Sequence, residues 1–299
     1  MISSVKLSGN PKPEEITLTD TAALVLEGGG MRGLYTCGVL DALLEEKIIF
    51  RTAIGVSAGT CNACSYMCLQ PGRAASVIID YIEKDYYCGA KVLLKTGDFF
   101  SKDFIYHKLP EELYPIDNST YEKLGVKLYS TVTNLRTGKA EYIPVNHMID
   151  DVEIIRASAS LPLLSRKVRI GNDFYLDGGV ADSLPIRQSE KMGNKKNVVI
   201  LTQPRNFRKE PSGTYPVVKA RYHKHEDFCK VMKNRHIHYN EALDYISERE
   251  KEGKCFVIAP HEKLGISRLE REPKKLTEIY EQGFRDAVSI MDNLKKFLK

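Results

Sequence analysis

A serine between two glycines is the first residue of this chain that could act as a nucleophile. Residues 55–59 read Gly-Val-Ser-Ala-Gly, with Ser57 at the centre. In this pattern the serine stands on a sharp turn between a strand and a helix, and Gly55 and Gly59 leave space where a Cβ atom would clash. The apolar run 48–54 predicts a buried strand before the turn, and the small residues after it can begin a helix. The sequence therefore predicts a nucleophile elbow that presents the Ser57 hydroxyl to a substrate.

A second glycine cluster, nearer the N-terminus, could bind an anion. The apolar run 21–26 leads into Glu27 and then into the glycine-rich segment 28–33, which is followed by a helical stretch over 34–47. Consecutive glycines at a helix start present backbone N–H groups, and the positive end of the helix dipole favours negative charge. In a serine hydrolase such a loop holds the oxyanion of the tetrahedral intermediate. The predicted oxyanion hole comprises Gly28, Gly29, Gly30, Arg32 and Gly33, with Arg32 as a positive charge beside the backbone donors.

The same loop also matches the G-x-G-x-x-G fingerprint of dinucleotide-binding proteins. That interpretation requires an acidic residue at the end of the next strand, roughly twenty residues further on, to bind a ribose hydroxyl. The next predicted strand ends in Gly-Val-Ser at 55–57, and Glu45 and Glu46 fall within the helix instead. A nucleotide-binding oxidoreductase is therefore the weaker alternative.

A base for the serine could come from an aspartate that follows another strand-like run. Residues 174–176 read Phe-Tyr-Leu and lead into Asp177-Gly178-Gly179. An aspartate before two glycines sits in a tight turn, where its carboxylate projects from the end of a strand. A hydroxyl nucleophile needs a base within hydrogen-bond reach. By itself the tripeptide is also a common hairpin turn, and only its occurrence together with the two glycine motifs favours Asp177 as the proton acceptor.

These motifs, in this order, resemble those of the patatin-like phospholipase family. The resemblance extends over residues 20–190 and includes the Ala-Ser-Ala-Ser-Leu-Pro block at 157–162, while 265–270 is similar to the bacterial branch. It implies hydrolysis of a lipid ester by a Ser57–Asp177 dyad without a catalytic histidine. It does not indicate which ester is cleaved.

A histidine-assisted mechanism stays open on the sequence alone. In α/β-hydrolases the triad runs in the order serine, acid, histidine. Five histidines follow Asp177, namely His223, His225, His236, His238 and His261. The Asp-Gly-Gly turn and the triple glycine favour the dyad, and the histidines of 223–238 are equally compatible with a solvated surface.

The elements that must position these motifs alternate along the chain. Strands are expected at 125–132, 140–144, 198–201 and 255–258. A long amphipathic helix is expected over 273–299, with Leu276, Ile279, Tyr280, Phe284, Ala287, Val288 and Met291 on one apolar stripe. We therefore predict a three-layer α/β/α fold, patatin-like, with a mostly parallel central sheet. Its predicted parts are a patatin-like phospholipase domain at 20–190 and a C-terminal α/β continuation at 191–299.

Composition is that of an ordinary globular protein. The chain has 299 residues, of which 42% are hydrophobic and 28% charged, enough for one large α/β domain. Its net charge of +5 permits contact with an anionic membrane surface but is too small to indicate nucleic-acid binding. No stretch approaches the length of a membrane span, and residues 1–20 have no apolar signal-peptide core. A cytoplasmic protein, with peripheral membrane contact permitted, is expected.

Three cysteines, Cys61, Cys64 and Cys68, have a spacing that resembles a metal or cluster site. On a helix, however, these positions form one face, and a buried free cysteine behaves as a small hydrophobe. We expect a structural role for them, and neither a metal nor a cofactor is expected.

Two further regions could shape a substrate site. Segment 92–114 is rich in apolar residues broken by Gly97 and Pro110, and it could line or cap an acyl pocket or form an ordinary core helix with a loop. Segment 205–235 is basic and could meet lipid head groups, although a solvated loop and helix face is the preferred interpretation.

The function expected from these features is serine acyl hydrolysis of a lipid or carboxylic ester, with Ser57 as nucleophile and Asp177 as proton acceptor. The alternatives are the nucleotide-binding oxidoreductase and a catalytically silent patatin-like regulatory protein.

Overall fold

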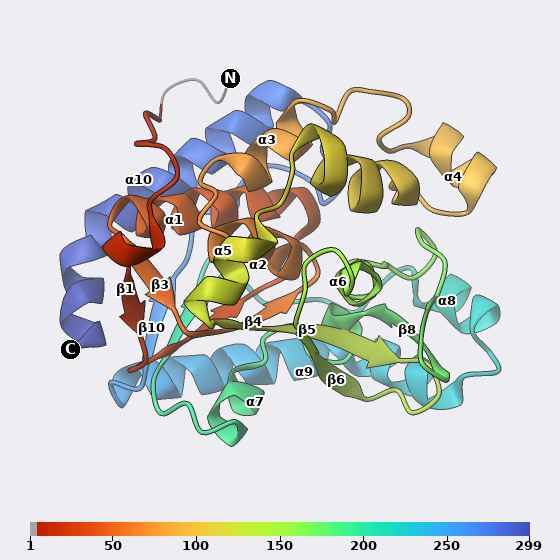
Figure 1. Ribbon diagram of the computed structural model, residues 1–299. Coiled ribbons are helices and arrows are strands. Elements are labelled where there is room, and N and C mark those ends of the chain that lie inside the picture. Colours follow the sequence, from red (N-terminus) through yellow and green to blue (C-terminus); the bar gives the residue numbers. More distant parts are fainter. Residues whose placement is uncertain (1–4) are drawn as a thin grey trace.

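The central element is an eight-stranded, mostly parallel sheet with helices on both faces (Figure 1). The computed structural model describes residues 5–299, so the first four residues of segment 1–20 lie outside the described chain. The strand order is β10-β9-β2-β4-β5-β8-β7, with β6 paired to β5, and β1 and β3 form a separate parallel pair. The strands are β1 Thr17–Thr19, β2 Ala23–Leu26, β3 Ile48–Phe50, β4 Thr52–Val56, β5 Lys127–Asn134, β6 Ala140–Val145, β7 Val168–Ile170, β8 Asp173–Asp177, β9 Asn197–Ile200 and β10 Cys255–Ile258.

Helices cover the sheet on both sides and give the three layers that were predicted. The α-helices are α1 Gly33–Glu45, α2 Ala58–Met67, α3 Arg73–Ile79, α4 Ala90–Thr96, α5 Asn118–Leu124, α6 Val152–Ser158, α7 Ile186–Lys191, α8 Tyr215–Arg221, α9 Glu226–Lys251 and α10 Pro273–Leu298. Shorter helical segments are η1 Pro13–Glu15, η2 Gly30–Arg32, the π-helix η3 Phe104–Leu113 and η4 Gly178–Val180. In Figure 1, α1, α2, α3 and α10 lie above the sheet, and α7 and α9 lie below it.

The side chains of β2 show that both faces of the sheet are covered by packed helices. All four of its residues are buried, as expected for a strand with parallel neighbours on both sides. Successive side chains point to opposite faces. Leu24 and Leu26 accordingly belong to the apolar cluster under α1 and α10, whereas Val25 packs with residues of α9 and β10.

The register of β5 brings two distant strand ends together. Residues 127–131 of β5 pair in parallel with β4, so that Val56 lies opposite Thr131. The next residues of β5 pair antiparallel with β8, so that Val132 lies opposite Asp177. The last residue of β4 and the last residue of β8 therefore face adjacent positions of one strand, and Ser57 follows directly after the first of them.

The C-terminal part of the chain is built into the same body. Strands β9 and β10 extend the sheet beside β2. Helix α10 crosses α1 closely, because Gly38 faces the backbone of Tyr280 and Gly283 faces the backbone of Tyr35. A Cβ atom at either glycine would collide with the facing backbone, so the two helices need these glycines to approach.

Two local predictions were wrong. The run 48–54 is not one strand, because β3 pairs with β1 in the small sheet and only β4 enters the central sheet. Val288 does not belong to the buried stripe of α10, since it is 53% exposed. Within residues 5–299 the structure contains no helix whose length and apolar character would let it cross a bilayer.

Candidate active site

Ser57 occupies a strained turn between β4 and α2, as the sequence predicts. Its backbone has φ 54° and ψ −123°, a conformation that residues other than glycine rarely adopt. The flanking glycines are required by close packing. A Cβ atom at Gly55 would lie 2.5 Å from the Cα of Thr60, and one at Gly59 would lie 2.7 Å from the carbonyl oxygen of Leu26. Strain of this kind concentrates at functional sites.

Hydrogen bonds to a buried serine, Ser158, hold the elbow in place, and this serine was not among the predicted site residues. The N–H of Ser57 donates to Oγ of Ser158 at 2.8 Å, and Ser158 donates in turn to the carbonyl oxygen of Thr131 at 2.7 Å. Oγ of Thr60 lies 3.1 Å from the same hydroxyl. Ser158 belongs to the block 157–162, whose only signal in the sequence was its resemblance to the family.

Asp177 ends β8 and points one unpaired oxygen into the site. Oδ1 accepts the N–H of Gly179 at 2.8 Å, which fixes the carboxylate. Oδ2 is buried and has no hydrogen-bond partner among the described residues. Burial raises the pKa of Asp177, while the nearby Ser57 hydroxyl and the Arg235 guanidinium act in the opposite direction. Gly178 packs against the backbone of Thr131 without room for a Cβ atom.

The glycine-rich loop lies directly against the elbow. A Cβ atom at Gly28 would be 2.9 Å from the Cβ of Ser57. Gly30 has φ 57°, and the N–H of the next residue, Met31, donates to the carbonyl oxygen of Arg268 at 3.1 Å. Among the described residues, no hydrogen bond uses the N–H groups of Gly28 and Gly29. These two donors are therefore free for a ligand beside Ser57.

A buried glutamate fixes this loop. Oε1 of Glu27 accepts the hydroxyl of Tyr239 at 2.7 Å. Oε2 accepts the N–H of Thr202 at 2.6 Å and its hydroxyl at 3.0 Å. The loop is thus tied to α9 and to the segment after β9, neither of which is near it in sequence.

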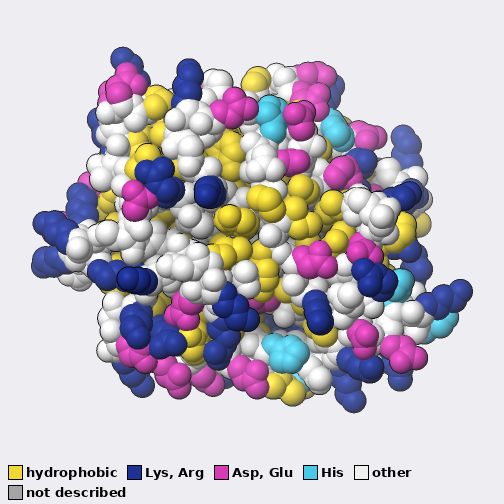
Figure 2. Space-filling view, turned by 60° about the horizontal axis from the view of Figure 1, so that its bottom comes forward, with side chains coloured by type: hydrophobic (Ala, Val, Ile, Leu, Met, Phe, Trp, Pro, Cys, Tyr) yellow, Lys and Arg dark blue, Asp and Glu magenta, His cyan; other side chains and the backbone are white. Residues whose placement is uncertain are grey.

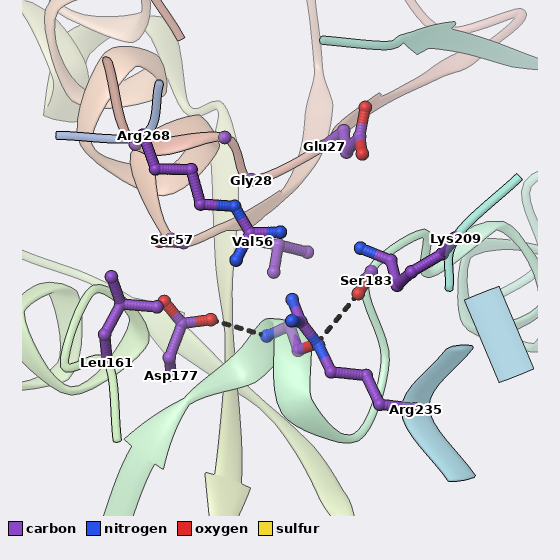
Figure 3. A pocket seen from close by; sticks show the side chains of 13 residues that line it. Glu27, Gly28, Val56, Ser57, Leu161, Asp177, Ser183, Lys209, Arg235 and Arg268 are labelled. Atoms are coloured by element: carbon purple, nitrogen blue, oxygen red, sulfur yellow. Dashed lines mark hydrogen bonds between the residues drawn. The ribbon is translucent and has the colours of Figure 1, made fainter. Parts of the chain in front are cut away.

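A small polar cavity of about 20 Å³ lies between Ser57, Asp177 and the loop. Figure 3 shows that Lys209, Arg235 and Arg268 also point into it. Arg235 donates to the carbonyl oxygen of Gly179. Burial and the charge of Arg268 lower the pKa of Arg235 to about 10, and burial together with Arg235 lowers the pKa of Lys209 to about 6.

The preferred interpretation of segment 205–235 as a solvated face is therefore wrong for two of its cations, since Lys209 and Arg235 line the cavity. Sequence periodicity contains no signal for this placement. Arg268 lies within 265–270, a segment singled out only for its resemblance to the bacterial branch.

Two predicted oxyanion-hole residues lie elsewhere in this region. Arg32 is largely desolvated but is not among the residues that line the cavity, and burial lowers its pKa. Gly33 joins α1 to α2, because its carbonyl oxygen accepts a hydrogen bond from Asn62 at 2.8 Å. Arg268, rather than Arg32, lines both cavities at Ser57.

A second, apolar cavity of about 140 Å³ begins on the other side of Ser57. Its apolar walls come from α2, α3 and the segment around η3, and include Cys61, Val77, Ile78, Tyr87, Phe100, Ile105, Tyr106 and Leu161. Segment 92–114 thus contributes to a pocket, as one of the two interpretations expected. It is not an ordinary core helix, because only Val92 and Leu109 among its apolar residues are fully buried and Leu94 is 88% exposed.

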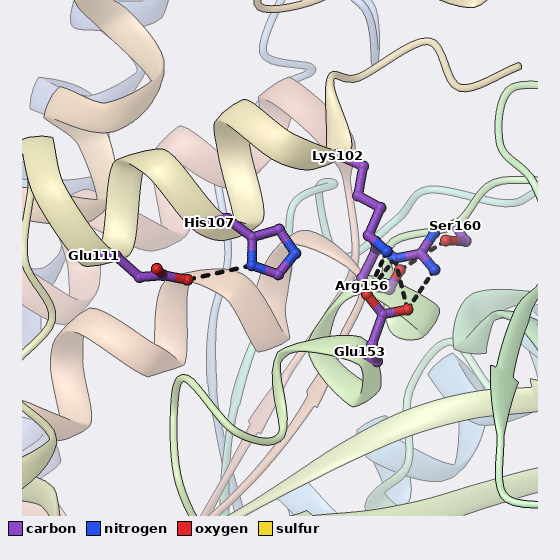
Figure 4. Close-up of polar contacts among 6 residues, drawn as sticks. All are labelled: Lys102, His107, Glu111, Glu153, Arg156 and Ser160. Atoms are coloured by element: carbon purple, nitrogen blue, oxygen red, sulfur yellow. Dashed lines mark hydrogen bonds and ion pairs between the residues drawn. The ribbon is translucent and has the colours of Figure 1, made fainter. Parts of the chain in front are cut away.

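One ion pair links this segment to α6 (Figure 4). Nζ of Lys102, just before η3, lies 3.1 Å from Oε1 of Glu153. Glu153 also pairs with Arg156 of the same helix. In η3 itself, His107 lies 3.2 Å from Glu111. Of these pairs, only Lys102–Glu153 joins α6 to the segment that carries Ile105 and Tyr106.

None of the histidines of the described chain lines either cavity at Ser57. His223 and His225 line a separate cavity. The arrangement around Ser57 therefore brings together the serine, the aspartate and three basic side chains, with the histidines of the described chain elsewhere.

The cysteine run of α2 consists of free thiols. Cys64 and Cys68 are buried and Cys61 faces the apolar cavity. Burial raises the pKa of Cys61 and of Cys68 to about 12, so these thiols stay protonated at neutral pH. In the part of the chain that the structure describes, no group of three or more His, Cys, Asp or Glu side chains is placed to hold a metal ion.

Two family models match different parts of the chain. Residues 24–189 match the family model described as patatin-like phospholipase. Residues 225–299 match a domain of unknown function, DUF6363. Arg235, Tyr239 and Arg268 therefore reach the candidate site from the second of these segments.

Three individual proteins illustrate the similarity. The uncharacterized protein YjjU of Escherichia coli is 31% identical over 61% of this chain and 52% of its own length, so the chain matches about half of that relative. The probable lipid hydrolase 463L of Invertebrate iridescent virus 6 is 29% identical, over 63% of this chain and 70% of its own. The crystal structure of VipD from Legionella pneumophila aligns with 92% of this chain and 67% of that chain at a TM-score of 0.48 and 13% identity.

The family model covers more than half of the sequence and includes the glycine-rich loop, the serine elbow and the Asp-Gly-Gly turn. This chain belongs to the patatin-like phospholipase family.

Proposed function

We propose that this protein is a lipid acyl hydrolase that uses Ser57 as nucleophile and Asp177 as general base. The observation that carries the proposal is the position of Ser57 on a strained elbow, between a polar cavity with Asp177 and an apolar cavity. The unpaired Oδ2 of Asp177 is the atom that takes the hydroxyl proton as Oγ attacks the ester carbonyl. Within residues 5–299, no histidine lines these cavities to act as an intermediate base.

The oxyanion that forms in this step is placed against the free N–H groups of Gly28 and Gly29. Donors fixed in advance stabilise charge that develops only in the transition state. The guanidinium of Arg268 adds positive charge on the same wall. Collapse of the intermediate returns the proton from Asp177 to the leaving alcohol. Asp177 then removes a proton from the water that cleaves the acyl-enzyme.

The apolar cavity is the proposed place for the acyl chain. It opens beside Ser57 and its walls are mostly aliphatic and aromatic, which is what binding of a hydrocarbon chain requires. The curated relatives described as a probable lipid hydrolase and as lysophospholipases agree with a lipid substrate. A cytoplasmic location and peripheral contact with a membrane stay predictions, as does the domain boundary at 190–191.

The site is unfavourable for the two alternatives. The polar cavity beside the glycine-rich loop has room for about one water molecule, and the loop is packed against Ser57 and Thr202. A dinucleotide pyrophosphate does not fit there without rearrangement. A silent regulatory protein would have no need for a strained serine next to an unpaired buried carboxylate.

The proposal is tested by labelling with a fluorophosphonate and by a panel of esters that differ in acyl length. An activated serine reacts covalently, whereas a nucleotide-binding or silent protein does not. We expect a single modification, mapped to Ser57 by mass spectrometry, together with hydrolysis of long-chain esters. A folded protein that remains unlabelled and cleaves no ester would refute the proposal.

Replacement of a loop glycine should lower the rate. In Gly29→Ala the new methyl group would lie 2.7 Å from Oγ1 of Thr202, so that the loop must shift and its donors lose their alignment. Loss of one oxyanion donor costs on the order of 10²–10³ in kcat. The same contact should also lower Tm. Measured kcat values for Gly29→Ala and for Gly213→Ala, where nothing lies within 4 Å of the new methyl group, check this expectation. Equal rates in the two variants would show that the loop is not the oxyanion hole.

Filling the apolar cavity should change chain-length preference. Val77→Phe places a ring in the space proposed for the acyl chain. Each methylene that loses its burial costs about 0.8 kcal/mol, so kcat/KM for long-chain esters should fall by about tenfold or more while short-chain esters are spared. The matched control is Val217→Phe on the surface of α8, where the side chain is 58% exposed. A uniform loss across all chain lengths in Val77→Phe would contradict the assignment.

Activity should depend on the ionisation of Asp177. Burial raises its pKa above the ordinary value of 3.8, and only the carboxylate form can accept the serine proton. Hence kcat/KM should rise with pH through the raised pKa and should reach a plateau above it. The pH profile of a soluble ester, measured between acid and neutral pH, checks the direction. A rate that increases toward acid pH would contradict a carboxylate base.

A further inference from the structure

A cationic cavity lies apart from Ser57, on the side of the molecule where α8 lies. It is lined by residues of the segment 163–167 before β7, by 221–225 between α8 and α9, and by Gly97 and Phe174. Figure 2 shows Lys, Arg and His side chains gathered at the right-hand edge, the side on which α8 lies in Figure 1. None of these residues lines the cavities at Ser57, so this is a separate site.

The lining of this cavity contains positive charge without a balancing carboxylate. It has four permanent cations, Arg166, Lys167, Arg221 and Lys224, and no Asp or Glu. Within residues 5–299 none of the four forms an ion pair. Like charges gathered around one hollow repel one another unless an anion lies between them.

The acidic side chains of the neighbouring segments are occupied or face away. Asp173 pairs with Arg136 and Asp227 pairs with Lys230. Asp98 is buried, and its Oδ1 accepts the backbone N–H of Arg166 at 2.7 Å. Glu226 belongs to the first turn of α9 and does not line the cavity. The charge of the cavity is therefore not neutralised by the protein itself.

The start of a long helix adds to the positive field. His225 lines the cavity and is the residue before α9, a helix of 26 residues. The first N–H groups of a helix attract anions. Burial, with the charge of Lys167, lowers the pKa of His225, as expected for an imidazole that faces other cations.

The size of the cavity indicates what kind of anion it can hold. Its volume is about 720 Å³, which falls in the range of sites for organic ligands rather than for a bare ion. Guanidinium and ammonium groups are the usual partners of phosphate oxygens. The buried ring of Tyr222 provides an apolar wall for the organic part, whereas Nζ of Lys167 lies over the ring of Phe174, 4.0 Å from its centroid.

We propose that this cavity, formed by Arg166, Lys167, Arg221, Lys224, His223 and His225, is a non-catalytic binding site for a phosphate group carried on an organic molecule. The phosphate lies among the cations, and its organic part lies against Tyr222. The proposal concerns binding at a second site and does not depend on Ser57 as nucleophile.

One short segment of the chain connects the cationic cavity with the two cavities at Ser57. Leu161 lines both cavities at Ser57, and the same segment continues to Leu163 and Arg166 at the cationic cavity. The N–H of Phe99 donates to the carbonyl oxygen of Leu164 at 2.7 Å, and Phe100 lines the apolar cavity. A ligand in the cationic cavity therefore contacts the same short segment that forms a wall of the acyl site.

Binding is tested by titration calorimetry with glycerol phosphate and inorganic pyrophosphate as soluble probes. Sedimentation with vesicles of phosphatidylcholine, with or without phosphatidic acid, tests a lipid-borne phosphate, and Ser57→Ala protein is used there so that the vesicles are not hydrolysed. The test variant is Arg166→Gln/Arg221→Gln. The matched control is Lys219→Gln/Lys233→Gln, which removes the same charge from exposed positions of α8 and α9 outside the lining.

We expect soluble phosphate to bind and the test variant to weaken it by about tenfold or more, because hydrogen bonds to charged groups contribute about 1.5–3 kcal/mol each. The control variant should bind like the unmodified protein. Additional binding to phosphatidic acid vesicles, lost in the test variant alone, would identify a lipid head group as the source of the phosphate. Binding to the soluble probes alone would identify a soluble phosphorylated compound.

Three results would overturn the inference. The first is absence of binding to all probes. The second is an equal loss in the test and control variants, which would mean a diffuse charge effect. The third is a loss in Arg268→Gln but not in Arg166→Gln/Arg221→Gln, which would place the phosphate at Ser57 instead.

Discussion

Ser57→Ala is expected to abolish ester hydrolysis and fluorophosphonate labelling while the protein stays folded. Loss of the serine nucleophile in another hydrolase costs on the order of 10⁶ in kcat. The other serine that lines the polar cavity, Ser183, donates its hydroxyl to the carbonyl oxygen of Gly179 at 2.8 Å. The fold should survive because the elbow depends on Gly55, Gly59 and the hydrogen bond from the N–H of Ser57 to Ser158, all of which an alanine retains.

The measurement is the hydrolysis rate of purified protein, with folding checked by circular dichroism and Tm. Ser289→Ala, on the exposed side of α10, is the matched control and should keep full activity. Residual turnover in Ser57→Ala near that of the control would move the nucleophile to another residue.

Asp177→Asn is expected to lower kcat by on the order of 10⁴ or more, a loss comparable to that caused by removal of the acidic residue in other serine hydrolases. The amide has the shape of the carboxylate and can still accept the N–H of Gly179, but it cannot take up a proton from Ser57. Loss of activity would then reflect chemistry rather than packing.

The stability of this variant separates a base from a structural carboxylate. Because burial raises the pKa of Asp177 in the folded protein, this carboxyl group destabilises the fold progressively as pH rises from its ordinary pKa of 3.8 to the raised pKa, and the loss is complete above the raised pKa. At neutral pH the uncharged amide should therefore be at least as stable as the carboxylate. A lower Tm together with lost activity would instead indicate a structural role.

A panel of alanine variants at the histidines completes this test. The positions are His107, His147, His223, His225, His236, His238 and His261. No single variant should approach the loss seen in Asp177→Asn, since none of the histidines that the structure describes lines the cavities at Ser57. Asp182→Asn, a half-buried aspartate outside the cavity that accepts the hydroxyl of Tyr142, controls for loss of a hydrogen-bonded carboxylate. A folded histidine variant as inactive as Asp177→Asn would replace the dyad by a triad.

The amino-acid sequence by itself determined the local parts of this protein. The elbow at 55–59, the glycine loop at 28–33 and the turn at 177–179 depend on which positions tolerate a Cβ atom, and that requirement is visible as glycine. Strands such as 255–258 and the long C-terminal helix depend on apolar periodicity, which is also local. The family, the α/β class and the candidate dyad could therefore be predicted without coordinates.

The tertiary structure alone decided which distant residues meet. The register of β5 places the ends of β4 and β8 at adjacent residues, and no local pattern encodes that register. Tertiary packing also places Arg235 and Arg268 in the wall of the polar cavity beside Ser57. It gives Glu27 a hydrogen bond from Tyr239 and leaves Val288 exposed. From sequence alone, an isolated charged residue is predicted to be exposed to solvent. Its burial depends on packing partners far along the chain, which no local pattern shows. Arg166 and Lys167 belong to one segment, and Arg221 and Lys224 belong to another. These four cations line one cavity only because the fold brings the two segments together.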